Sequence, residues 1–110
     1  MGKKSIQKGK RNERNVVNKF KENGIVSIRI PLSGATEYKK GDVVVTIGGK
    51  AYVGEVKVRQ NGFATLYKWL EKDGAELLFL KRDRSDFLVC MRLDDFIDFA
   101  KKIQACMTNT

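Results

Sequence analysis

The sequence contains no histidine and only two cysteines. Without histidine the chain lacks the commonest metal ligand and the usual general base, so catalysis would have to use carboxylates, lysine or hydroxyl groups. Two cysteines cannot form a disulfide framework and leave no ligand cluster for a structural zinc ion. No apolar run approaches the roughly 20 residues that span a bilayer, and the basic start lacks the apolar segment of a signal peptide. We therefore expect a soluble, cytoplasmic protein with reduced cysteines.

Acidic residues are also in the minority. The formal net charge is +9, from 22 Lys and Arg against 13 Asp and Glu, which predicts salt-sensitive binding to a polyanion such as nucleic acid. Residues 1–21 hold eight of the basic residues and a single acid, Glu13. A solvated arm or a solubility tag would explain such a run equally well, so charge alone leaves both interpretations open.

The length of 110 residues has room for one compact domain with one hydrophobic core. We expect a single domain over residues 1–110, with residues 1–9 as a flexible basic arm. A helix is predicted over residues 10–23, because Val16, Val17 and Phe20 recur at helical spacing and Gly24 can end it. On that helix these three apolar residues lie within about 60° of Glu13, which puts Glu13 in the middle of the buried stripe.

The remaining elements follow from alternation, helical periodicity and turn residues. Gly48-Gly49 is the type of dipeptide that makes a two-residue hairpin turn between antiparallel strands. We expect strands over residues 25–31, 42–47, 50–58, 76–80 and 86–91, a polar loop over 32–40, and helices over 63–74 and 93–105. The order is αβββαββα, which predicts an α/β or α+β domain with a central mixed sheet flanked by helices.

The hairpin places a group of charged side chains together. If Gly48-Gly49 form the turn, the numbers of facing residues sum to 97, so Asp42 lies opposite Glu55. Two facing carboxylates are destabilising unless something neutralises them, and a divalent cation would do so. Lys57 points to the same side as Glu55, about 6.6 Å along the strand.

This group suits the hydrolysis of a phosphodiester. Mg²⁺ prefers oxygen ligands and would be held by Asp42 and Glu55, with Lys57 beside the attacking water and Glu13 binding through water or a second ion. Taken singly, Asp42 is explained as a turn residue and the Glu-x-Lys pattern as an exposed face. Glu13 favours the catalytic interpretation, because a buried acid without a partner is costly.

The spacing D-x(12)-E-x-K, at Asp42, Glu55 and Lys57, resembles the motif of PD-(D/E)XK nucleases. Over residues 9–57 the segments KGKRNERN, GIVSIRIPLSG, GDVVV and GEVKVR are similar, in order and spacing, to archaeal-type Holliday junction resolvases and their phage relatives. One departure is Gly41, where the motif has proline; we expect little effect, because that position contributes no ligand. The segment after Arg59 is also shorter than in the archaeal enzymes.

The resemblance implies a role for each matching residue. It implies a metal site made of Glu13, Asp42, Glu55 and the backbone carbonyl of Val56, with Lys57 in catalysis and Ser33 near the scissile phosphate. Arg14 and Arg29 match basic residues that the family needs for DNA handling or cleavage, although Arg14 would also be explained as a solvated charge and Ser33 as a turn former. The expected DNA-binding residues are Lys8, Lys10, Arg11, Arg14, Arg29, Lys39, Lys40 and Arg59.

The resemblance also implies an activity. We expect a Mg²⁺-dependent endodeoxyribonuclease, with Mn²⁺ able to substitute, that acts as a homodimer and resolves four-way DNA junctions by paired hydrolytic incisions. No membrane partner is expected. Two alternatives stay open: another PD-(D/E)XK enzyme of the VRR, restriction or nicking type, and a DNA-binding module that keeps the fold without catalysis.

Overall fold

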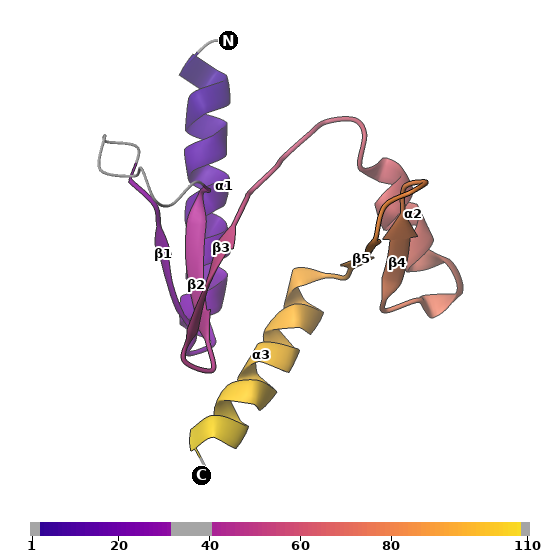
Figure 1. Cartoon of the computed structure of the whole chain (residues 1–110). Helices are drawn as coiled ribbons and strands as arrows, with labels where there is room; N and C mark the ends of the chain where they lie inside the picture. The colour runs from indigo at the N-terminus through magenta and orange to yellow at the C-terminus, as the bar shows by residue number, and fades with distance from the viewer. Residues whose placement is uncertain (1–2, 32–40, 109–110) are drawn as a thin grey trace. The chain divides into compact units, whose positions relative to one another are not determined.

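The computed structural model describes residues 3–31 and 41–108 (Figure 1). Its elements, in chain order, are α1 (Lys3–Glu22), β1 (Val26–Arg29), β2 (Val43–Ile47), β3 (Lys50–Gly54), α2 (Ala64–Glu71), the 3-10 helix η1 (Lys72–Gly74), β4 (Leu78–Lys81), β5 (Phe87–Cys90) and α3 (Leu93–Thr108). The protein is therefore mixed α/β, and apart from η1 its helices and strands alternate as the sequence predicts. In the part of the chain described, no helix is both long and apolar enough to cross a membrane.

The described strands form two antiparallel sheets, one with the order β1-β2-β3 and one made of β4 and β5. The single mixed sheet expected from the sequence is thus not what these strands form. Strands joined by short links pair with each other as hairpins, which explains the pairing of β4 with β5. The chain divides into two compact units, residues 1–58 with 99–110 and residues 59–98. One nuclease domain over the whole chain stays a prediction.

The first helix is longer than predicted. It begins at Lys3, so residues 3–9 are helical where a flexible basic arm was expected. Lys, Gln, Ser and Ile are all tolerated in helices, and the single Gly9 costs only about 1 kcal/mol relative to alanine without breaking the helix. The basic residues of this segment therefore belong to the helix α1.

The end of α1 agrees with the sequence. Gly24 adopts a φ of +74°, its N–H donates to the Lys21 carbonyl, and the Ile25 N–H donates to the Phe20 carbonyl, each at 3.0 Å. These two hydrogen bonds make a Schellman motif, in which a contact between the residues at its two ends is usual. Phe20 and Ile25 are both buried, so the turn that ends α1 also starts the core.

The three-stranded sheet lies against α1. Facing residues of β2 and β3 have numbers that sum to 97, from Val43 opposite Gly54 to Ile47 opposite Lys50, so the predicted register is confirmed. Strand β3 ends at Gly54, however, four residues before the predicted end. The core of this unit consists of Val17, Phe20, Ile25, Ile30, Val43, Val44, Val45, Ile47 and Ala100.

Candidate active site

Two side-chain hydrogen bonds connect β1 to α1. The Ser27 hydroxyl donates to the Val17 carbonyl at 2.9 Å, and Arg29 Nε donates to Glu13 Oε1 at 3.3 Å. Glu13 and Val17 are four residues apart on α1, or about 6.0 Å, and Ser27 and Arg29 are two residues apart on β1, or about 6.7 Å. Because these spacings match, both hydrogen bonds can form at once between the two elements. They set how far along β1 the helix lies, and therefore where Glu13 lies.

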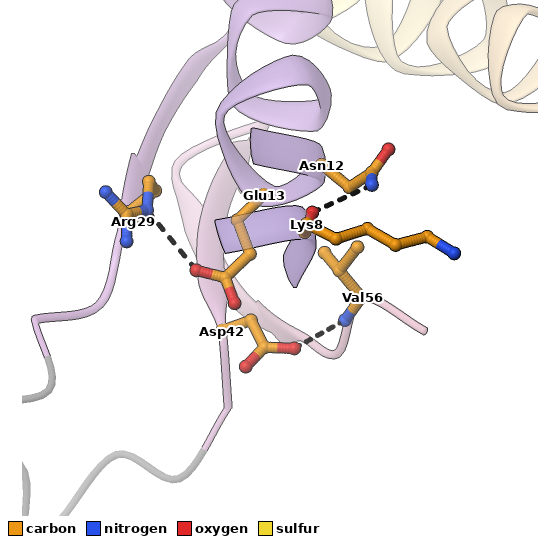
Figure 2. Close-up of polar contacts among 6 residues, drawn as sticks. All are labelled: Lys8, Asn12, Glu13, Arg29, Asp42 and Val56. Atoms are coloured by element: carbon orange, nitrogen blue, oxygen red, sulfur yellow. Dashed lines mark hydrogen bonds and ion pairs between the residues drawn. The ribbon is translucent and has the colours of Figure 1, made fainter. Parts of the chain in front are cut away.

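Glu13 is mostly shielded from solvent, with its side chain 18% exposed, and Arg29 is 31% exposed. Figure 2 shows the Glu13 side chain leaving α1 on the side of Asp42, with one carboxylate oxygen turned to Arg29. The sequence argument treated Glu13 as a buried acid without a partner, and that premise is wrong, because Arg29 is its partner. An ion pair of this kind offsets much of the cost of burying the carboxylate.

Asp42 lies one residue before β2 and joins both neighbouring strands. Its carbonyl accepts from the Ile30 N–H and its N–H donates to the Gly54 carbonyl, each at 2.9 Å. Its carboxylate Oδ2 accepts from the Val56 N–H at 2.7 Å (Figure 2). In a longer β3 the Val56 N–H would donate to a backbone carbonyl of β2. Because it donates to the Asp42 side chain instead, the strand pairing ends at Gly54.

Glu55 and Lys57 follow the end of β3. Lys57 Nζ lies 3.6 Å from Glu55 Oε2, and the two side chains are 58% and 56% exposed. Glu55 Oε1 lies 3.9 Å from the position that a Cβ on Gly41 would take, so the carboxylate is next to the Gly41-Asp42 segment. The predicted pairing of Asp42 with Glu55 would lie beyond the last pair of the ladder, Val43 and Gly54, and it stays a prediction. Neither residue belongs to a strand.

Gly41 allows this close approach. Its φ is +149°, and an added Cβ would collide with Val53 Cγ1 and lie 3.2 Å from the Gly54 carbonyl oxygen. A proline here is excluded in this conformation, because its ring fixes φ near −65°. The expectation that the departure from the motif has little effect is therefore wrong: glycine is what lets the chain pass close to β3 and brings Asp42 to Val56.

The oxygen donors suit a hard cation, but they are not gathered into one cluster. Among the residues described, no three His, Cys, Asp or Glu side chains are grouped closely enough to hold a metal ion. Each predicted acidic ligand has a partner instead: Arg29 for Glu13, the Val56 N–H for Asp42 and Lys57 for Glu55. Asp42 Oδ1 makes no hydrogen bond to any described residue, so it is available to a cation. A purely oxygen donor set fits Mg²⁺ or Mn²⁺.

The predicted DNA-binding residues fall into three groups. Lys8, Arg11 and Arg14 are exposed on α1, Lys10 is half-buried there, and Arg59 is exposed. Arg29 is half-buried and contacts Glu13 of α1. Ser33, Lys39 and Lys40 lie outside the described residues. The Arg29–Glu13 pair, the role of Ser27 and the role of Gly41 were not identified from the sequence. Of these, only Ser27 had a signal in the sequence, because it occupies an inward-facing position of an alternating strand.

A comparison with protein families identifies this chain's family. The model of the family described as archaeal Holliday junction resolvase (hjc) matches residues 4–105. This range includes every residue of the site above and most of the 110-residue chain. The comparisons with curated proteins and with solved structures found no match.

Proposed function

Because the chain belongs to the archaeal Holliday junction resolvase family, a family of nucleases that act on branched DNA, we propose that it is a Mg²⁺-dependent endodeoxyribonuclease. It would resolve four-way junctions by paired hydrolytic incisions. The observation that carries the proposal is the position of Asp42, which is held by three hydrogen bonds to Ile30, Gly54 and Val56, with the Glu13 side chain directed towards it (Figure 2).

In this proposal Asp42, Glu55 and the Val56 carbonyl hold the ion, and Glu13 binds it through water. A bound Mg²⁺, or Mn²⁺ in its place, would supply an activated water at neutral pH and offset charge that develops on the phosphate. Lys57 lies 3.6 Å from Glu55 and is more than half exposed, so its ammonium is free to turn to a phosphate oxygen or to the attacking water. Asp42 keeps its orientation through the Val56 N–H.

The basic residues would bind the phosphates of the junction. Lys8, Arg11 and Arg14 are exposed on the helix α1, which supports a role in binding phosphates. Contacts of this kind position DNA without reading its sequence, and their strength falls steeply with salt. Lys10, Arg59, Lys39 and Lys40 would add to the same surface, and Ser33 would lie near the scissile phosphate.

Two incisions need two active sites. A symmetric homodimer would place one site on each of two strands, in keeping with the two-fold symmetry of a four-way junction. We include in this proposal a single nuclease domain of the PD-(D/E)XK type over residues 1–110. The half-maximal Mg²⁺ concentration and the sedimentation coefficient with and without junction DNA would measure the ion dependence and the subunit number.

The test compares three DNA substrates: synthetic four-way junctions, linear duplex and single strands, each incubated with Mg²⁺ and with the wild type or Asp42→Asn. Paired nicks on junctions alone, lost in the variant, are the expected result. Equal cutting of linear duplex would instead favour another PD-(D/E)XK nuclease. Junction binding without cutting under Mg²⁺ or Mn²⁺ would favour a non-catalytic DNA-binding module.

A further inference from the structure

Arg29 faces a different way from the exposed basic residues Lys8, Arg11 and Arg14 of α1. On β1 it shares a side with Ser27, and both side chains contact α1. The residues that face the other way, Val26 and Ile28, are 65% and 54% exposed. Arg14, next to Glu13 in sequence, is exposed on α1. Arg29 is therefore placed for a contact inside the site.

The contact that Arg29 makes involves its Nε, which donates to Glu13 Oε1 at 3.3 Å. A guanidinium is planar, so fixing Nε also fixes the plane of the group and restricts the carboxylate that it holds. Glu13 leaves α1 on the side of Asp42 (Figure 2). The charge on Arg29 also reduces the repulsion between the Glu13 and Asp42 carboxylates.

We propose that Arg29 is a positioning residue that acts on cleavage through Glu13 and not through a contact with DNA. This inference rests on the nuclease function proposed above. Arg29 holds one oxygen of Glu13 against β1 and so keeps this carboxylate one step away from the ion, bound through water. Partners of this kind typically change activity or metal affinity by about 10-fold to 100-fold when they are removed.

A double-mutant cycle tests the route of the effect. Arg29→Gln should lower the single-turnover cutting rate by about 10-fold to 100-fold at saturating junction DNA and Mg²⁺. In a Glu13→Gln background the same change should cost less than about 3-fold, because the partner is already gone. Full additivity of the two losses would overturn the proposal. Arg29→Lys keeps a donor for this single hydrogen bond, so it should recover part of the rate, and a folded Lys variant without recovery would count against it.

A second readout does not depend on cutting. Junction affinity, measured with Ca²⁺ in place of Mg²⁺, should change less than about 2-fold for Arg29→Gln and fall clearly for the matched change Arg14→Gln. The NMR signal of the Arg29 Nε–H should persist when junction DNA is added and shift in Glu13→Gln. Equal loss of affinity in both arginine variants would overturn the proposal. A wild type that binds junctions and cuts nothing would overturn the nuclease function instead, so the two failures are distinguishable.

Discussion

The central strand of the first unit is buried more deeply than either strand of the second unit. In the first unit, four of the five residues of β2 are buried, and Asp42, Ser27 and Arg29 are each held by a hydrogen bond to another element. In the second unit, Phe79 of β4 and Phe87, Leu88 and Val89 of β5 are each about 60% exposed or more. Every described residue proposed for catalysis belongs to the first unit. The unit with the buried central strand is thus the one that holds the proposed site, and a preorganised site requires such support.

The largest effect should come from Asp42→Asn. Asparagine keeps an oxygen that can accept from the Val56 N–H, so the fold is retained, but the charge that would hold the ion is lost. We expect the cutting rate on four-way junctions to fall by at least about 100-fold, with an unchanged unfolding midpoint. Asp86→Asn, at an exposed position of the second unit, is the matched control and should cut at the wild-type rate. Equal losses in both variants would remove the distinction between the units.

Gly41→Pro should have the next largest effect, although it restores the residue that the family motif carries. The φ of +149° is not available to proline, and the new Cβ would collide with Val53. Strain and overpacking together predict a loss of roughly 2–4 kcal/mol in the free energy of unfolding, measured with urea. Gly9→Ala on α1 is the control: nothing lies within 4 Å of its Cβ, and it should stabilise the protein by about 0.5–1 kcal/mol. A stable, active Gly41→Pro would contradict this account of the site.

These positions show which features the sequence could predict. The register of β2 and β3 depends only on a two-residue turn and on counting, so facing numbers that sum to 97 were predictable. The end of β3 was not, because the alternation of Glu55, Val56 and Lys57 continues the strand pattern. The strand ends there because the Asp42 side chain takes the Val56 N–H, a contact between residues 14 apart.

The site was predictable only in its residue types. Glu13 was identified from its place in the apolar stripe of a helix. Its partner Arg29 is 16 residues away, and their contact depends on the position of α1 along β1. Hydrophobic periodicity gives the buried face of a helix and not its offset along a strand. Gly41 was expected to have little effect because it contributes no metal ligand. Its role in the close approach of the chain to β3 depends on its φ and on its distance to Val53.

A smaller effect is expected for Ser27→Ala. Ser27 is 1% exposed and its hydroxyl donates to the Val17 carbonyl, so the change removes one of the two side-chain hydrogen bonds described between α1 and β1. A buried hydrogen bond contributes about 0.5–1.5 kcal/mol to the free energy of unfolding, and we expect a loss in that range by urea denaturation. Ser85→Ala is the matched control in the second unit, because the Ser85 hydroxyl accepts from Arg82 Nε at an exposed site. It should change stability by less than about 0.5 kcal/mol. The reverse order would show that the second unit is the more rigid.

The smallest effect should come from Arg84→Gly in the turn between β4 and β5. Arg84 has a φ of +62° and is the one non-glycine residue with positive φ in the described part of the chain. Glycine adopts this conformation without strain, although it loses more conformational freedom on folding, so the two terms nearly cancel. We expect a gain of at most about 1 kcal/mol in the free energy of unfolding, measured by urea denaturation. Asp83→Gly is the control and should lose stability, because it relieves no positive φ. A loss in Arg84→Gly as large as that in Gly41→Pro would mean that the second unit depends on its turn as strictly as the first depends on Gly41.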